Sequence, residues 1–132
     1  MTPEQVRDAL AAAVQTAVAN AFPTYWENAD TVPIDTVGDF FLHVSVDFQA
    51  AKQASVEAHP LTRLTGNLSL THMQKEGTGT KALMARADAL NAELKHLTLS
   101  DLQLATPTPG RKQSLKGWFS QEWLVPFWTH DR

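Results

Sequence analysis

The chain has 132 residues, of which 43% are hydrophobic and 19% are charged, and its formal net charge is −3. This size and composition are typical of one globular domain, so we expect residues 1–132 to form a single unit around one core. The acidic balance disfavours a general nucleic-acid-binding protein, and the absence of cysteine excludes disulfides, thiolate zinc sites and cysteine nucleophiles.

The first expected element is a helix that begins at Thr2. With Thr2 as the N-cap, Pro3 at the first helical position and Gln5 at the third, the sequence predicts a capping box. A stripe of valine, leucine and alanine follows, and Pro23 stops the helix near residue 20. The alanines allow close approach of another surface; we interpret this face as core packing, with a partner-binding face as the alternative.

Residues 22–36 (FPTYWENADTVPIDT) are expected to form an irregular connection because they contain two prolines and several turn-forming residues. Tyr25 and Trp26 are bulky for a loop in solvent. We expect them to cover the edge of the core, and a contact surface for another protein is the alternative.

Two strands form the centre of the predicted sheet. Residues 39–48 and residues 63–71 both alternate between apolar and polar side chains, and we expect them to pair as an antiparallel hairpin. His43 lies on the polar face without a second ligand two residues away, so it is interpreted as a surface residue. The connection 49–60 is longer than an ordinary hairpin loop. It is either a projecting arm that orders on a partner or a flexible excursion.

A second helix is expected over residues 80–96, where leucine and alanine form a stripe. The preceding run 77–81 (GTGTK) lacks the GxxxxGK[ST] spacing of a phosphate loop, so we interpret it as a turn in which Thr78 or Thr80 caps the helix. The leucines of residues 97–104 then predict a short extended return.

The last part of the chain contains a loop and a strand. Residues 107–116 are expected to form a turn-rich loop with a local basic cluster. Residues 117–128 predict the final strand, with Trp118 and Trp128 on its second face and with Pro126 at a sheet edge. Large apolar groups on both faces indicate that one face is covered by a helix and the other by the first helix or a neighbouring subunit.

Together these elements predict an α+β fold. We expect a mostly antiparallel sheet of about four strands packed on two helices, in the order α-β-β-α-β-β.

The sequence shows no pattern of residues that is typical of catalysis or metal binding. The five histidines are scattered without HxH or HExxH spacing, no GxSxG motif presents a nucleophile, and the apolar strands hold no paired carboxylates. The longest apolar run is far short of the ~20 residues that a membrane span needs, and the opening residues do not resemble a signal peptide. We expect no enzyme activity, no cofactor, no metal and no membrane association.

Three stretches carry a resemblance to a known family: residues 40–46 (FFLHVSV), residues 65–70 (TGNLSL) leading to the GTGT turn and the following helix, and the closing aromatic strand from 117–119 to 125–127. In this layout the chain resembles the bacteriophage tail terminator family, the minor tail protein U-like tail-completion proteins. The resemblance implies a ring, usually hexameric, that caps the tail tube, ends its polymerisation and offers a surface to a head–neck completion protein. It also implies a structural role without enzyme activity or cofactor. The expected location is the head-proximal end of the virion tail, with the host cytoplasm during assembly.

A ring is built from head-to-tail contacts, in which two different patches of each subunit meet. We expect those patches on the exposed face of the last strand, on the 49–60 arm and on the 107–116 loop. The candidate residues for the ring or tube interface are Trp118, Trp128, Lys52, Val56, Arg111, Lys112 and Lys116.

Two alternative functions remain open. The first is another phage neck protein, such as a head–tail connector or completion protein. The second is a small-ligand-binding domain or an undetected enzyme. The last would need a concave pocket with converging polar groups.

Overall fold

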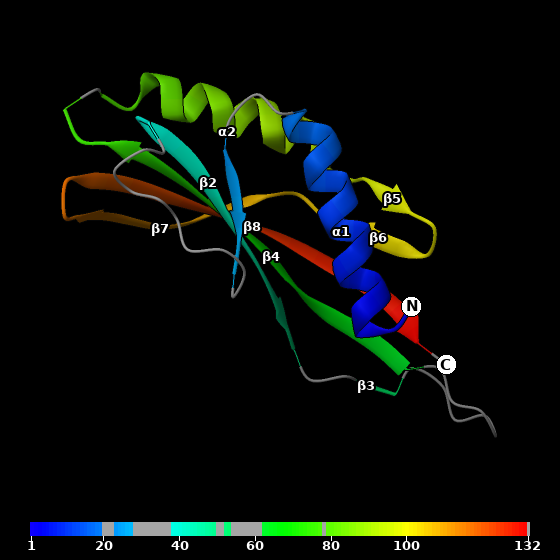
Figure 1. The fold of residues 1–132 in the computed structure, drawn as a ribbon. Coiled ribbons are helices and arrows are strands. Elements are labelled where there is room, and N and C mark those ends of the chain that lie inside the picture. Colours follow the sequence, from blue (N-terminus) through cyan, green and yellow to red (C-terminus); the bar gives the residue numbers. More distant parts are fainter. Residues whose placement is uncertain (20–22, 28–37, 50–51, 54–61, 78, 132) are drawn as a thin grey trace.

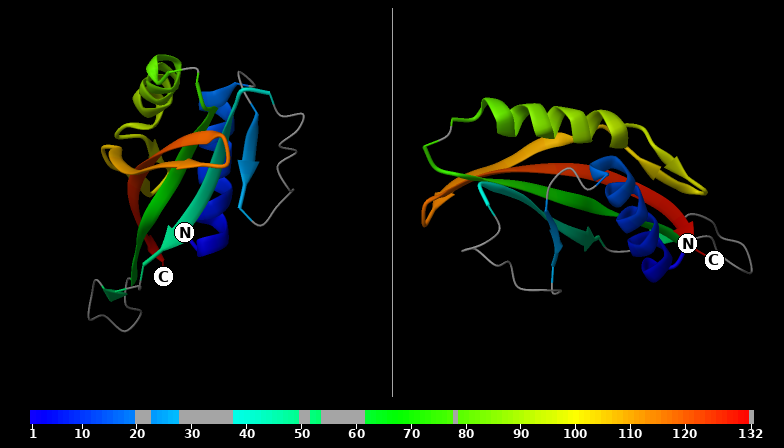
Figure 2. Two further views of the ribbon diagram at one scale, coloured as in Figure 1. Left: turned by 90° about the vertical axis from the view of Figure 1, so that its left-hand side faces the viewer. Right: turned by 45° about the horizontal axis from the view of Figure 1, so that its top comes forward.

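The computed structural model describes residues 1–19, 23–27, 38–49, 52–53, 62–77 and 79–131. Over these residues the chain forms two helices and eight strands (Figure 1). The strands form one curled sheet, and both helices pack on the same face of it, as the further views show (Figure 2).

The helices are α1 (Pro3–Val18) and α2 (Lys81–Leu94). The strands, in chain order, are β1 (Thr24–Trp26), β2 (Phe40–Phe48), β3 (Lys52–Gln53), β4 (Thr62–Lys75), β5 (Thr98–Leu99), β6 (Leu102–Leu104), β7 (Thr108–Leu115) and β8 (Trp118–Asp131). Along the sheet the order is β1-β2-β4-β8-β6-β5, with β3 on β4 and β7 on β8. The β1–β2 pair is parallel, and the other pairs are antiparallel.

The expected antiparallel hairpin of the two central strands is confirmed. Strands β2 and β4 pair from Phe40 opposite Gln74 to Phe48 opposite Gly66. The predicted fold of about four strands on two helices, in the order α-β-β-α-β-β, is wrong, because the described residues hold eight strands in a mixed sheet. Four of the eight strands, β1, β3, β5 and β6, have only two or three residues, which is too short for a period of two to be recognised.

The predicted loop at residues 107–116 is also wrong, because most of it is strand β7, which pairs with the first half of β8. Lys116 (φ 51°) and Gly117 (φ 83°) form the two-residue turn between these strands, and Leu115 pairs with Trp118. Positive φ at both central residues is the mark of the type I′ turn, whose twist matches that of paired strands. The prolines and glycine of this segment indicated a loop, whereas its strand conformation depends on β8.

Pro126 does not lie at a sheet edge, because β8 has β4 on one side and β6 and β7 on the other. The carbonyl of Pro126 accepts a hydrogen bond from the amide of Ala105 (2.8 Å). In an antiparallel ladder, a residue's carbonyl and amide positions point to the same side. The missing amide hydrogen of Pro126 therefore faces the gap between β7, which pairs up to Leu124, and β6, which pairs from Phe127. The proline is tolerated because no strand continues the ladder there.

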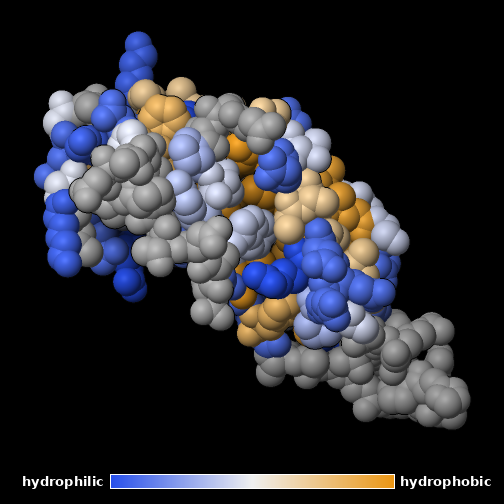
Figure 3. All heavy atoms as spheres, viewed as in Figure 1, coloured by the Kyte–Doolittle hydropathy of each residue, from blue (hydrophilic) through white to orange (hydrophobic). Residues whose placement is uncertain are grey.

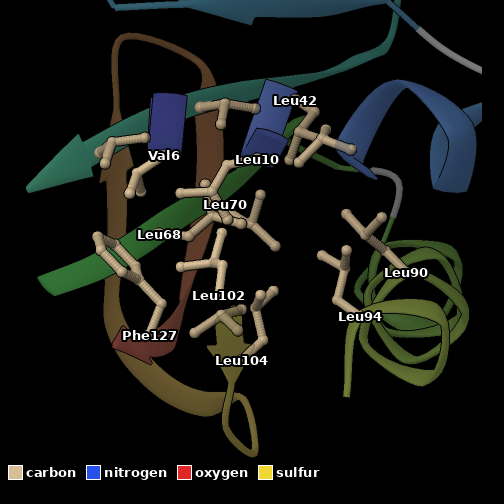
Figure 4. Packing of buried hydrophobic residues seen from close by; sticks show 14 of the residues in the cluster. Val6, Leu10, Leu42, Leu68, Leu70, Leu90, Leu94, Leu102, Leu104 and Phe127 are labelled. Atoms are coloured by element: carbon tan, nitrogen blue, oxygen red, sulfur yellow. The ribbon is translucent and has the colours of Figure 1, made fainter. Parts of the chain in front are cut away.

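The core lies between the helices and one face of the sheet. Leucines and valines from both helices and from β2, β4, β6 and β8 meet there, and Figure 4 shows them pointing toward one another. The largest fully buried aliphatic side chains are Leu10, Leu42, Leu68, Leu70, Leu83, Leu94 and Leu102. The apolar stripes of both helices face this core, and so do Leu42, Val44 and Val46 of β2, whereas Phe48 at the end of β2 is 40% exposed.

The N-terminus of α1 carries the predicted capping box. The Gln5 amide donates to Oγ1 of Thr2 (3.3 Å), and the Thr2 amide donates to Oε1 of Gln5 (2.9 Å). At α2, Thr80 is the N-cap but forms no side-chain capping hydrogen bond, and Thr78 lies outside the described residues.

Thr2→Ala is expected to lower the free energy of unfolding by about 1 kcal/mol, because it leaves the Gln5 amide without its capping acceptor. Urea unfolding of the variant and the wild type measures the loss. Thr16→Ala, an exposed position in the same helix, is the control. We expect no loss there, since alanine is the better helix former. Equal losses in the two variants would contradict the capping role.

Candidate functional site

Those of the predicted interface residues that the structure describes fall toward the two ends of the long strand β8. Arg111, Lys112 and Lys116 lie on β7 and on the turn that joins it to the start of β8, whereas Trp128 lies near the end of β8 (Figure 1). The ten residue steps from Trp118 to Trp128 span about 33 Å at 3.3 Å per step. The candidate residues therefore form two separate groups.

Trp118 does not lie on an exposed face, and that prediction is wrong. Its side chain is only 7% exposed and contacts the ring of Phe41 edge-on, with 5.1 Å between centroids. Phe41 in turn contacts Tyr25 (5.8 Å). These aromatic residues come from three strands and cover one another on the sheet face opposite the helices. Trp118 therefore contributes to folding, and its side chain is not available to a partner.

Trp128 lies half-buried on the same face of the sheet, at its other end. The Arg63 guanidinium stands over its ring (4.6 Å to the centroid), and His130 contacts it edge-on (5.4 Å). We call Arg63, Trp128 and His130 the Trp128 patch. A tryptophan whose rotamer is held by neighbours, beside an arginine, is the kind of group that anchors protein interfaces.

Of the predicted 49–60 arm, the structure describes residue 49 and strand β3. The backbone of Lys52 pairs with that of Arg63, which places this strand next to the Trp128 patch. Val56 lies outside the described residues.

The β7–β8 hairpin carries three positive charges near its turn. Arg111, Lys112 and Lys116 are exposed, and none of them forms an ion pair with a carboxylate of the described residues. Hydrophilic residues gather at this end of the molecule, whereas hydrophobic residues are seen beside α1 (Figure 3). We call these three residues the basic hairpin.

A buried polar cluster under the start of α2 was not predicted. Burial, together with the positive charge of Arg86, lowers the pKa of His72 to about 4, so the imidazole is neutral at pH 7. The Arg86 guanidinium donates to Oε1 of Gln74 (2.9 Å) and stands 3.9 Å from the ring of Phe40. Nε2 of His72 has no hydrogen-bond partner among the described residues.

The sequence indicates the direction of these polar side chains but not their burial. The buried polar residues on this part of the sheet are His72, Gln74 and Gln121. His72 and Gln74 continue the even-numbered face of β4 that holds Leu68 and Leu70, so their direction follows from the period of two. Their burial depends on α2, which the period does not show.

Two apolar grooves of about 400 and 370 Å³ flank the place where α1 and α2 meet. Alanines line both of them, and the first also contains Arg86, whose guanidinium is held by Gln74 and Phe40. A ligand site usually combines such a groove with polar groups that converge on the ligand. In the first groove Arg86 is held by its neighbours, and in the second the polar lining residues are Thr16 and Glu93.

The described residues contain no group of three or more His, Asp and Glu side chains placed to hold a metal ion. Neither α1 nor α2 is long and apolar enough to cross a membrane.

No protein-family model matches the sequence, and no curated protein matches it. A solved structure without a functional name matches over 96% of this chain and 96% of its own, with a TM-score of 0.65 and 16% sequence identity. At this identity the likeness shows the fold alone. The protein is thus a curled mixed sheet that two helices cover on one face. Its surface carries two separate groups of residues, the Trp128 patch and the basic hairpin.

Proposed function

We propose that this chain is a structural protein of a bacteriophage tail, which caps the tail tube, ends its polymerisation and provides the interface for head–tail joining. The proposal is supported by the resemblance carried by residues 40–46, 65–70 and the closing aromatic strand. Its partners in this role are further copies of itself in a ring of six, the tail tube protein and a head–neck completion protein. Its place is the head-proximal end of the tail, and the role involves no enzymatic step and no cofactor.

The observation that carries the proposal is the separation of the Trp128 patch from the basic hairpin along β8. It is about 23 Å from Trp128 to Gln121, the residue opposite Lys112, and about 33 Å to the turn that holds Lys116. A capping ring needs subunits with several distinct surfaces, for the neighbours on each side and for the structures above and below. One rigid pair of long strands, β4 and β8, holds these two patches at a fixed distance.

Within this role the Trp128 patch is the anchor for a partner. Arg63 and His130 restrict the indole in the free protein, so binding loses little side-chain entropy. Its half-buried ring leaves apolar area for a partner to cover.

Tail tubes assembled from the cognate tube protein, with and without this chain, test the function. Negative-stain electron microscopy measures their length. Tubes that stop growing and carry a ring of extra density at one end support the proposal. Tubes of unbounded length without bound density overturn it, and binding to the portal side instead identifies a neck completion protein.

Trp128→Ala is expected to raise the concentration needed for capping at least tenfold, because it removes the aromatic anchor. The same tube-length assay, carried out as a titration, measures the change. Leu124→Ala is the control, since Leu124 is half-buried on the same face of the same strand. Urea unfolding establishes that both variants are folded. If the Trp128→Ala variant caps tubes at the same concentration as the wild type, the Trp128 patch is not part of the interface.

A further inference from the structure

The charges of this chain are segregated along the sequence. Residues 8–51 contain six Asp and Glu and no Lys or Arg, whereas residues 102–121 contain three Lys and Arg and no Asp or Glu. Of the acidic residues, Glu27, Asp39 and Asp47 lie on or next to β1 and β2 in the described part of the chain. The three basic residues form the basic hairpin.

The fold brings these two segments to opposite edges of the sheet. The order β1-β2-β4-β8, with β7 paired to the first half of β8, places β1 four strand spacings from β7. At about 4.8 Å per spacing the two edges are about 19 Å apart. One lateral edge is therefore acidic and the other is basic, although the sequence patterns of the individual strands do not show it.

The charges on both edges are available. Asp39 and Asp47 are exposed and form no ion pair with a Lys or Arg of the described residues, and the basic hairpin is equally free of carboxylates. Glu27 is half-buried, and its Oε1 accepts a hydrogen bond from the Val46 amide (3.0 Å). This amide on the edge of β2 is therefore already paired.

We infer that copies of this chain associate head to tail, with the basic β7 edge of one copy against the acidic β1–β2 edge of the next. This inference rests on the proposed ring and names the surfaces that form it. Because the contact joins two different surfaces, it repeats from copy to copy, and it forms a closed ring when the rotation per copy is a whole fraction of a full turn. Opposite charges set the register, speed the encounter and make the contact sensitive to salt.

The contact is made by side chains and not by a continuous backbone ladder. The register of β7 on β8 shifts between Pro109 and Lys112, and a proline and such a shift are both devices that keep an edge strand from pairing. Because the edges point sideways and the Trp128 patch lies near the end of β8, edge contacts leave that patch accessible to the tube or the neck.

Charge reversal tests the inference. The acidic variant carries Arg111→Glu and Lys112→Glu, so both of its edges are negative; the basic variant carries Asp39→Lys and Asp47→Lys, so both edges are positive. Lys81→Glu with Lys95→Glu, two exposed positions at the ends of α2, is a control with the same change in net charge as the acidic variant. Sedimentation velocity at about 0.05 M and 0.5 M salt measures self-association.

We expect wild type and the α2 control to associate at low salt and to dissociate at high salt. Each edge variant alone associates at least tenfold more weakly, because equal charges then meet. A mixture of the two variants, and a single chain that carries all four edge substitutions, associate again.

Edge variants that associate as wild type does, or a mixture that fails to associate, overturn the inference. So does wild type that stays monomeric at low salt, which would assign the basic edge to an acidic partner protein. The tube assay separates this inference from the proposed function. If both edge variants cap tubes fully, the proposed function holds and the edge contact is not needed for it. If the copies associate through their edges but do not cap tubes, the contact holds and the proposed function does not.

Discussion

Gly66→Ala is expected to lower the free energy of unfolding by about 3 kcal/mol, at the upper end of what overpacking a core costs. Gly66 lies in β4 between Phe48 of β2 and Phe127 of β8, and the two rings meet edge-on over it, with 5.7 Å between centroids. An added Cβ would collide with the carbonyl oxygen of Asp47 and would lie 2.7 Å from Cζ of Phe127. The backbone of Asp47 is fixed by its own strand and does not move aside without breaking the β2–β4 pairing, and the ring of Phe127 is buried in the core.

Gly110→Ala is the matched control for this substitution. A Cβ at Gly110 would also meet a close neighbour, Oε1 of Glu122 at 2.5 Å, but that atom is the end of a flexible side chain. We expect a loss below about 1 kcal/mol, partly offset by the smaller entropy of the unfolded chain. Urea unfolding compares the two variants. Equal losses would show that the space around Gly66 adapts and that the fixed backbone of Asp47 is not the cause.

The parts of the fold that the sequence predicts are those whose signal is local. The capping box at Thr2 and the alternation of residues 39–48 and 63–71 need no knowledge of the rest of the chain, and the structure confirms them. Strand β7 needs such knowledge. Its composition is that of a loop, and it is extended because the turn at residues 116–117 folds it back on β8. The parallel pairing of β1 with β2 likewise depends on contacts with the rest of the fold, because a three-residue strand is too short to show a pattern in the sequence.

The candidate site likewise has a part that the sequence predicts and a part that depends on the rest of the fold. The period of two correctly places Trp118 and Trp128 on the same face of β8. Their exposure differs because Phe41, from a strand two positions away in the sheet, covers Trp118, whereas a half-buried Trp128 carries Arg63 on its face. The segregation of charge is visible in the sequence, but only the order of the strands shows that the two segments become opposite edges.

His72 makes the stability of this fold depend on pH. Its imidazole is 2% exposed, and burial together with the positive charge of Arg86 lowers its pKa from 6.5 to about 4. Between these two values the unfolded chain binds a proton that the folded chain does not, so acidification favours unfolding. The stability is fully present above pH 6.5, falls as the pH is lowered, and loses no more from this group below about pH 4. At 1.36 kcal/mol per pKa unit the full loss is about 3 kcal/mol, of which about 2 kcal/mol is reached at pH 5.

Urea unfolding at pH 7.5 and pH 5 measures this loss, and His72→Leu identifies its source. In the variant, the difference in the free energy of unfolding between the two pH values is expected to shrink by about 2 kcal/mol, because the titrating group is gone. Gln121→Met is the control, since Gln121 is a buried, non-titrating neighbour that pairs with His72 across β4 and β8. It changes stability by the same amount at both pH values and keeps the wild-type pH dependence. An unchanged pH dependence in His72→Leu would show that other groups cause the acid sensitivity and that His72 is protonated in the folded chain as readily as in the unfolded one.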